Sequence, residues 1–274
     1  MKLLENEVAR LLGIMEAACL KGAAYLVSAA EGDIEVTDSR KADGSLVLNL
    51  DIESQRIIFG ELDGVLPLVG EETPSSHSLI TPANTYLVID PIDGTSACKR
   101  FLSSQGGQVG FGPIIGLVVE GTLRAACYYN VPERSLFSAI KGGGAFKINC
   151  PDPEKVMPPA LNLRQRLIIK DQRTLSQSGL LFYPGLEGEV QFVLKLRKKA
   201  KIESINRFGG FANDCTRLAQ GYEQIIVQFR AKAWDVAAAL IPMEAGLAVT
   251  IDPKRRVQSL AEWKVELENP VIVA

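Results

Sequence analysis

Residues 86–97, YLVIDPIDGTSA, place two aspartates three positions apart at the end of an apolar run. Pro91 fixes its own φ angle and removes an N–H donor, and Gly94 lets the backbone double back. We therefore expect a strand that stops at Pro91, followed by a rigid elbow with Asp90 and Asp93 on one side. Two carboxylates this close repel each other, so the pair predicts a bound cation.

The residues behind the elbow predict an anion site beside the cation. A helix that starts near Gly94, Thr95 and Ser96 would direct its free N–H groups toward the same cavity, where they favour an anion such as phosphate. A DxxDG pentapeptide is also typical of a simple capped turn. The pattern alone leaves both interpretations open.

Further carboxylates occur at other expected element ends. Glu71 and Glu72 follow a short apolar run in VGEET (69–73), and Asp235 opens a helical pattern over residues 233–249. Singly, the glutamates are typical of an exposed acidic turn and Asp235 of a helix N-cap. Together with a single histidine in the chain, the acids favour magnesium or manganese, because zinc, copper and iron prefer imidazole or thiolate. Two such ions about 4 Å apart could clamp the attacking and leaving oxygens of a phosphoryl transfer.

The composition indicates a folded protein with a substantial core. Of 274 residues, 47% are hydrophobic and 23% charged, and the formal net charge of −2 gives no global attraction to nucleic acid or anionic membrane. Five widely spaced cysteines argue for a reducing compartment. The acids near the N-terminus argue against a signal peptide, and no apolar run approaches the ~20 residues of a membrane span. We expect a cytoplasmic protein.

Helical and strand patterns alternate in blocks and indicate stacked α and β layers. The proline-rich segment 150–161 interrupts them, so we expect an N-terminal α+β domain over residues 1–150 and a C-terminal α/β domain over residues 151–274. The patterns predict helices over residues 3–28, 46–58 with a start near Asp51, 188–200 and 233–249. They predict strands over residues 87–91, 135–140, 161–170, 223–229 and 270–274, with a hairpin over 110–129 that turns at Glu120 and Gly121.

Four segments resemble the signatures of a known family. KADGSLVLNLD (41–51), GEE (70–72), IDPIDGT (89–95) and WDVAA (234–238) are similar, in this order, to motifs of the inositol monophosphatase superfamily. The resemblance implies a five-layer αβαβα sandwich and a magnesium-dependent, lithium-sensitive phosphatase that uses two or three Mg²⁺ or Mn²⁺ ions. Members are commonly homodimers, so a homodimer is expected by analogy.

The resemblance also implies a role for each motif residue. The implied metal ligands are Glu71, Asp90, the carbonyl of Ile92, Asp93 and Asp235. The implied catalytic residues are Glu71 and Thr95, which hold the attacking water, together with Asp93 and Lys41, and Asp51 is a supporting acid. Backbone amides of Gly94, Thr95 and Ser96 would hold the phosphate. The implied reaction is a direct in-line attack of activated water, without a covalent phosphoenzyme.

The match departs from the family near the expected substrate end. Inositol-specific members carry a glutamate seven residues before the WD aspartate, and this chain has Gln228 there, so an anionic acceptor for sugar hydroxyls is lost. Gly210 and Asn213, in the turn GGFAND (209–214), are expected to contact substrate. Cys98 stands where many members carry an aromatic residue, and a buried structural cysteine is the favoured interpretation over a reactive thiol.

The default substrate is inositol 1-phosphate, a small-molecule ester, and neither a nucleic acid polymer nor a membrane is an expected partner. Alternatives within the same chemistry are a 3′(2′),5′-bisphosphate nucleotide, histidinol phosphate and fructose 1,6-bisphosphate. Arg230 and Lys232 would suit a second phosphate, or they are surface charges. The non-enzyme alternative is an inactive member that senses a metal or ligand, which the crowded acids argue against, since they cost stability without catalytic benefit.

Overall fold

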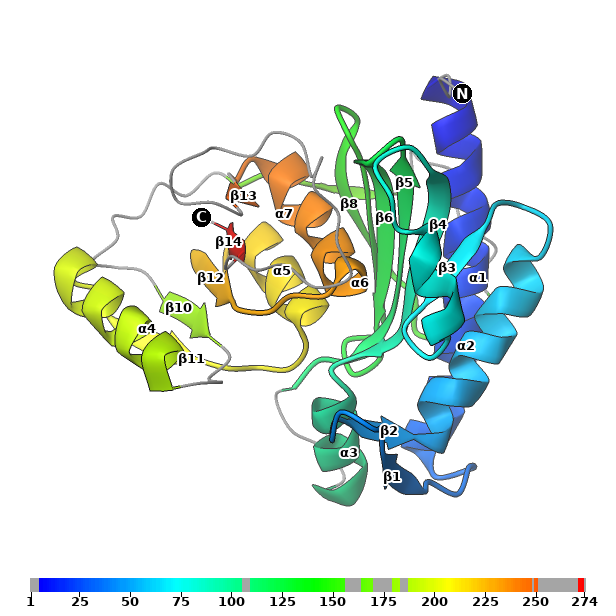
Figure 1. The fold of residues 1–274 in the computed structure, drawn as a ribbon, viewed down its shortest axis with the longest axis horizontal. Helices are drawn as coiled ribbons and strands as arrows, with labels where there is room; N and C mark the ends of the chain where they lie inside the picture. Colours follow the sequence, from blue (N-terminus) through cyan, green and yellow to red (C-terminus); the bar gives the residue numbers. More distant parts are fainter. Residues whose placement is uncertain are drawn as a thin grey trace.

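The computed structural model describes residues 5–104, 109–155, 164–169, 179–182, 187–247, 249–250 and 271–273. Its elements form five layers in the order helix, sheet, helix, sheet, helix, which lie side by side across Figure 1. The layered α/β sandwich expected from the motifs is therefore confirmed.

The first layer consists of α1 (Glu5–Glu31) and α2 (Asn49–Leu62). The three- and four-residue spacing of apolar side chains along α1 buries one stripe, including Leu12, Met15 and Cys19, against the larger sheet. By length and composition alone α1 could cross a membrane, although the sequence was expected to contain no apolar run of that length. Most of the apolar 18-residue stretch of this helix is buried inside the protein, as in a core helix.

The second layer is a seven-stranded sheet in the order β3-β4-β5-β6-β7-β8-β9. Only β3 and β4 are parallel, and every other neighbouring pair is antiparallel. The strands are β3 (Leu68–Gly70), β4 (Thr85–Asp93), β5 (Gly112–Val119), β6 (Thr122–Asn130), β7 (Ser135–Ile140), β8 (Gly144–Asn149) and β9 (Gln165–Leu167). The hairpin turn at Glu120 and Gly121 is confirmed, with φ angles of 48° and 70°.

The third layer fills the space between the sheets. It contains α5 (Phe211–Ala219), α6 (Ala233–Val236), the 3-10 turn η4 (Ala237–Ala239) and α7 (Leu240–Ala245). The pattern over residues 233–249 predicted one helix, and Gly246, with a φ of 118°, ends α7. Apolar side chains of this layer share one core with both sheets, and Figure 1 shows its helices between the two sheets.

The fourth and fifth layers complete the sandwich. The five-stranded sheet has the order β11-β10-β12-β14-β13, and α4 (Glu187–Ala200) packs on its outer face. Its strands are β10 (Gly179–Phe182), β11 (Ser204–Asn206), β12 (Ile225–Gln228), β13 (Val249–Thr250) and β14 (Val271–Val273). The remaining described elements are the two-stranded β1 (Asp38–Arg40) and β2 (Leu46–Leu48), the helix α3 (Thr95–Ser104) and the 3-10 helix η1 (Pro74–Leu79). Leu48 of β2 and Cys98 of α3 join the core beneath α1 and α2.

One local expectation was wrong. Pro91 does not stop its strand, because β4 continues to Asp93 and its register against β5 shifts between Asp90 and Asp93, where a bulge accommodates the missing N–H. The helix expected to start near Asp51 begins at Asn49, and residues 46–48 before it form β2. Residues 156–163, in the expected break between domains, lie outside the described residues. The boundary at residues 150 and 151 stays a prediction.

Candidate active site

The elbow at the end of β4 presents its acids through local backbone geometry. The Asp90 carboxylate accepts a hydrogen bond from the N–H of Ile92 at 2.8 Å, which fixes the side chain against its own turn. Gly94 follows with a φ of 89°, and a Cβ there would lie 2.8 Å from the backbone nitrogen of Gly210. Only glycine therefore lets the chain turn into α3 at this point.

The Asp93 carboxylate is held by the first turn of α5. Its two oxygens accept hydrogen bonds from the N–H groups of Phe211 (3.0 Å) and Ala212 (2.8 Å). Gly210 permits this contact, because a Cβ at that position would come within 1.9 Å of an Asp93 oxygen. Asp93 is thus positioned by a helix far away in the sequence. Burial, followed by the charge of Asp235, raises the pKa of Asp93 well above its usual value, and the two backbone bonds oppose this shift.

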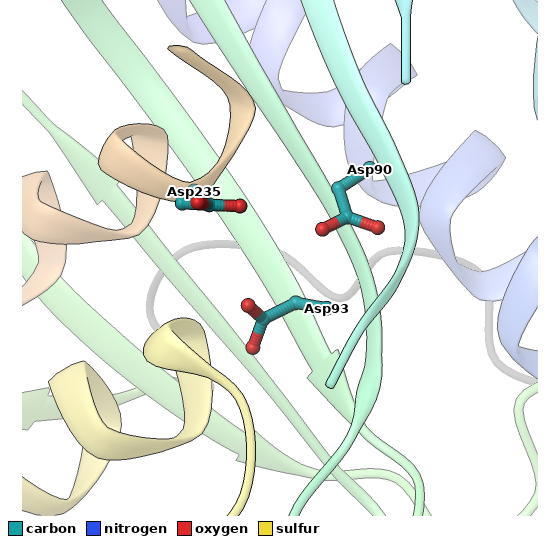
Figure 2. A group of neighbouring side chains, drawn as sticks. All are labelled: Asp90, Asp93 and Asp235. Carbon is teal, nitrogen blue, oxygen red and sulfur yellow. The ribbon is translucent and has the colours of Figure 1, made fainter. Parts of the chain in front are cut away.

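Asp235 completes an acidic cluster with Asp90 and Asp93. It lies in the first turn of α6, where its carboxylate accepts a hydrogen bond from the N–H of Lys232 at 2.9 Å. One carboxylate oxygen from each of the three aspartates lies within 4.8 Å of the others, and Figure 2 shows the side chains converging between β4 and α6. The acids predicted at separate element ends are brought together by the fold.

The electrostatics of this cluster call for a cation. Burial, followed by the charges of Glu71, Asp93 and Asp235, raises the pKa of Asp90 well above its usual value. Burial and then Glu71 raise the pKa of Asp235 to about 7. A divalent cation among the three carboxylates would offset both the lost hydration and the mutual repulsion. Because the donors are all carboxylate oxygens, the residues fit magnesium or manganese.

Glu71 faces the same site from the end of β3. Its charge is the strongest like-charge influence on both Asp90 and Asp235. The Lys41 ammonium donates to Glu71 at 2.8 Å and to Glu72 at 2.5 Å. Burial opposes the charge on Lys41, but these two ion pairs outweigh burial and raise its pKa. The loop between β1 and β2 therefore reaches the site, as its motif implied.

Thr95 and Asp51 form a second pair beside the cluster. The Thr95 hydroxyl lies 3.1 Å from an Asp51 oxygen and 3.3 Å from the Ile92 carbonyl, while the other Asp51 oxygen accepts from the N–H of Leu48. Asp51 is buried, and burial raises its pKa to about 8. Thr95 also begins α3, so the first turn of that helix follows Asp93 directly in the chain. The role of the Gly94, Thr95 and Ser96 amides in holding phosphate stays a prediction.

The residues predicted to contact substrate lie in different environments. Asn213 is buried in α5, where its amide oxygen accepts from Asn130 and its nitrogen donates to Asp214, so the structure gives it internal partners. Gln228 ends β12, and its amide oxygen is buried without a hydrogen-bond partner in the described part of the chain. The role of Asn213 and Gln228 as substrate contacts stays a prediction.

The structure also locates Arg230, a candidate contact for a second phosphate, and Cys98, a candidate reactive thiol. Arg230 forms an ion pair with Glu189 of α4 at 3.2 Å, which partly neutralises the charge suggested for a second phosphate. Cys98 is fully buried in α3, and burial, followed by the charge of Asp51, raises the pKa of its thiol. This agrees with the interpretation of Cys98 as a structural residue.

Sequence reasoning missed residues that hold the ligand-bearing turns. Gln55 of α2 accepts from the N–H of Glu72 and donates to the hydroxyl of Thr73. His77 of η1 bonds the carbonyl of Gly70. Neither contact follows a local pattern, although the singular occurrence of histidine in the chain could have directed attention to His77.

Comparisons with known proteins point to one family. The signature of the "Inositol monophosphatase family" matches residues 8–273. A curated inositol-1-monophosphatase of Mesorhizobium japonicum is 28% identical, covering 86% of this chain and 83% of that protein. The "Nus factor SuhB" of Pasteurella multocida is 25% identical with the same two coverages. The crystal structure of a suhB protein from Bartonella henselae superposes with a TM-score of 0.73 at 25% identity, over 97% of this chain and 93% of that one.

Proposed function

The chain belongs to the inositol monophosphatase family and is therefore a phosphatase, and we propose that its substrate is a small phosphate monoester, with inositol 1-phosphate as the first candidate. The observation that carries the proposal is the convergence of Asp90, Asp93 and Asp235 within 4.8 Å at the opening of α3. Oxygen ligands and helical N–H groups meet there, so a divalent cation and a phosphate would touch.

The residues that would hold Mg²⁺ are the three aspartates, with Glu71 and the carbonyl of Ile92 at the margin of the cluster. When bound, the cation supplies positive charge that attracts the ester phosphate and acidifies water. The binding of two or three ions stays a prediction. The ionised carboxylates balance that charge, and the hydrogen bonds to Asp90, Asp93 and Asp235 from backbone N–H groups keep their oxygens in place.

The chain's own groups would prepare the attack on phosphorus. When Asp51 is ionised, the Thr95 hydroxyl can donate its single proton to that carboxylate, and its lone pairs are then left to accept a hydrogen bond from a water. Glu71 can accept a hydrogen bond from the other O–H of that water once its bond to Lys41 is given up, and it can take up that one proton as the water oxygen attacks phosphorus. The first N–H groups of α3 stabilise the charge that builds on the phosphate oxygens.

The choice among phosphate esters depends on the surroundings of Gln228. An amide there can bond sugar hydroxyls but lacks the negative charge of a carboxylate. The ion pair of Arg230 with Glu189 weakens the bisphosphate nucleotide as a substrate, although Lys232 still stands three residues before Asp235. We therefore rank inositol 1-phosphate first, above the bisphosphate nucleotide, histidinol phosphate and fructose 1,6-bisphosphate.

Phosphate release from this panel in the presence of Mg²⁺ tests the proposal. We expect the wild type to hydrolyse at least one ester, with kcat/KM highest for inositol 1-phosphate, and lithium to inhibit. Asp90→Asn should lower kcat/KM by roughly 10²–10⁴-fold, because the amide keeps the bond from Ile92 but loses the charge. Asp63→Asn, the same change at the exposed end of α2, is the matched control and should leave activity unchanged.

If phosphate is released fastest from another ester of the panel, the proposed reaction stands and the preferred substrate is that ester. If no ester of the panel is hydrolysed, the proposal is contradicted. We further propose a cytoplasmic homodimer with a small-molecule partner. The relative named as a Nus factor makes a nucleic-acid-associated role a specific alternative. Light scattering after size-exclusion chromatography measures the subunit number, and titration of the protein with RNA measures whether it binds nucleic acid.

A further inference from the structure

We propose that His77 is a positioning residue that ties together two separate walls of the metal site. It lies in η1, between β3 and β4, and touches the residue before Glu71 on one side and the residue before Asp235 on the other. The inference rests on the proposed function, because it takes Glu71 and Asp235 to share bound cations.

On the Glu71 side, η1 holds the Gly70 peptide from both ends. The N–H of Gly70 donates to the hydroxyl of Ser76 at 3.2 Å, and the carbonyl of Gly70 lies 2.9 Å from Nε2 of His77. Ser76 also donates its hydroxyl proton to the carbonyl of Thr73 at 2.6 Å. The N–H of Thr73 donates to the same Gly70 carbonyl at 3.1 Å, and the N–H of Glu71 donates to the Ile89 carbonyl at 3.0 Å. His77 and Ser76 add side-chain bonds to this backbone frame, and together they set the direction in which the Glu71 carboxylate leaves β3.

The chemistry of the contact assigns the proton on the imidazole. A carbonyl oxygen only accepts hydrogen bonds, so Nε2 of His77 must carry a hydrogen and donate it to Gly70. Gly70 has no room for a side chain, because a Cβ there would lie 2.2 Å from the Gln55 amide oxygen. Gln55 therefore packs closely against Gly70, while His77 bonds the Gly70 carbonyl.

On the Asp235 side, the imidazole packs against an indole. The ring centroids of His77 and Trp234 are 5.0 Å apart with an interplanar angle of 38°, which is within the range of favourable aromatic pairs. Trp234 is 4% exposed and is the second residue of the short helix α6. Asp235 follows Trp234 in the first turn of a helical segment that continues from α6 through η4 into α7, so packing on the indole acts at the turn that sets where Asp235 points.

A pair of variants separates the two contacts. His77→Gln keeps a donor for Gly70 but removes the ring, and His77→Phe keeps a ring for Trp234 but removes the donor. Ser78→Ala is the matched control, since Ser78 is exposed on the same helix and its hydroxyl bonds the Ser75 carbonyl. Each protein is titrated with Mn²⁺ and followed by electron paramagnetic resonance, and its thermal unfolding is measured in EDTA.

We expect each His77 variant to bind Mn²⁺ about 10-fold more weakly and to need correspondingly more Mg²⁺ for half-maximal activity, while Ser78→Ala matches the wild type. A residue with a merely structural role would lower the melting temperature in EDTA and leave the Mn²⁺ affinity unchanged. That result for both variants would overturn the proposal.

The wild type supplies a second measurement that needs no substitution. Because the chain contains one histidine, ¹⁵N-histidine labelling gives a single imidazole spectrum. We expect a protonated Nε2 and a shift of the ring signals on addition of Mg²⁺, whereas an unprotonated Nε2 or an unmoved spectrum would contradict the inference. If the wild type cleaves no ester, the proposed function fails, but the Mn²⁺ affinities still decide the role of His77.

Discussion

At the scale of single residues, replacement of Asp235 by asparagine separates its charge from its hydrogen bond. The carboxylate caps α6 by accepting from the N–H of Lys232, and an amide oxygen can do the same. The charge, in contrast, is unfavourable without metal, since burial and Glu71 raise the pKa of Asp235 to about 7. Above pH 7 the ionised side chain therefore destabilises the metal-free protein.

We expect Asp235→Asn at pH 8 in EDTA to melt roughly 2–8 °C above the wild type, which corresponds to about 1–2 kcal/mol. With Mg²⁺ the order should reverse, because the wild type gains stability by binding metal and the variant gains less. Differential scanning calorimetry with and without Mg²⁺ measures both effects. A variant that melts below the wild type in EDTA would show that the cap, and not the charge, dominates at this residue.

At the scale of elements, the approach of α5 to the end of β4 depends on Gly210. A Cβ at this position would overlap an Asp93 oxygen at 1.9 Å, so Gly210→Ala must push either the carboxylate or the helix away. We expect a loss of about 1–3 kcal/mol in the free energy of unfolding. We also expect roughly 100-fold lower kcat/KM, because Asp93 leaves its position.

Gly60→Ala is the matched control for this change. Gly60 is exposed near the end of α2, and a Cβ there meets no atom within 4 Å. The substitution should stabilise the protein by about 0.5–1 kcal/mol, since alanine loses less backbone entropy on folding than glycine, and should leave activity unchanged. Chemical denaturation and a phosphatase assay measure the pair. Wild-type activity in Gly210→Ala would contradict the close approach of α5 to Asp93.

Elements whose signals are local could be predicted from the sequence. The periodicity of α1, the turn at Glu120 and Gly121, and the glycine that ends α7 each depend on neighbouring residues, and each is confirmed. The continuation of β4 past Pro91 was missed, because the bulge that accommodates the proline is set by pairing with β5. The residues around Pro91 do not reveal which strand will pair with them or in which register.

The candidate site likewise contains residues that the sequence predicted and supporting residues that it did not. The acids and the elbow at Asp90 and Asp93 were visible as motifs, and the fold brings Asp235 to them. What no motif indicated is the support behind these acids. The bond from Phe211 to Asp93 joins residues 118 positions apart, and the contact of His77 with Trp234 joins residues that are still farther apart in the chain. Such contacts follow from packing of whole layers.

At the scale of the whole molecule, the buried acids set how stability depends on pH. Asp51 and Asp235 have pKa values raised from 3.8 to about 8 and about 7, and the pKa of Asp90 is raised as well. Between about pH 4 and pH 8 the folded chain therefore holds protons that the unfolded chain has released. Because the folded state binds more protons, its stability must fall as the pH rises through this window.

We expect the melting temperature in EDTA to decrease from pH 5 to pH 8, with each such group contributing at most about 1.4 kcal/mol per pH unit. Mg²⁺ should raise the melting temperature most at pH 8, where the carboxylates are ionised, and little at pH 5, where protons compete with the metal. Calorimetric scans across this range, with EDTA or Mg²⁺, test both trends. A metal-free melting temperature that rises with pH would mean that the acids of the cluster are ionised without a cation, which would remove the electrostatic reason for a metal at this site.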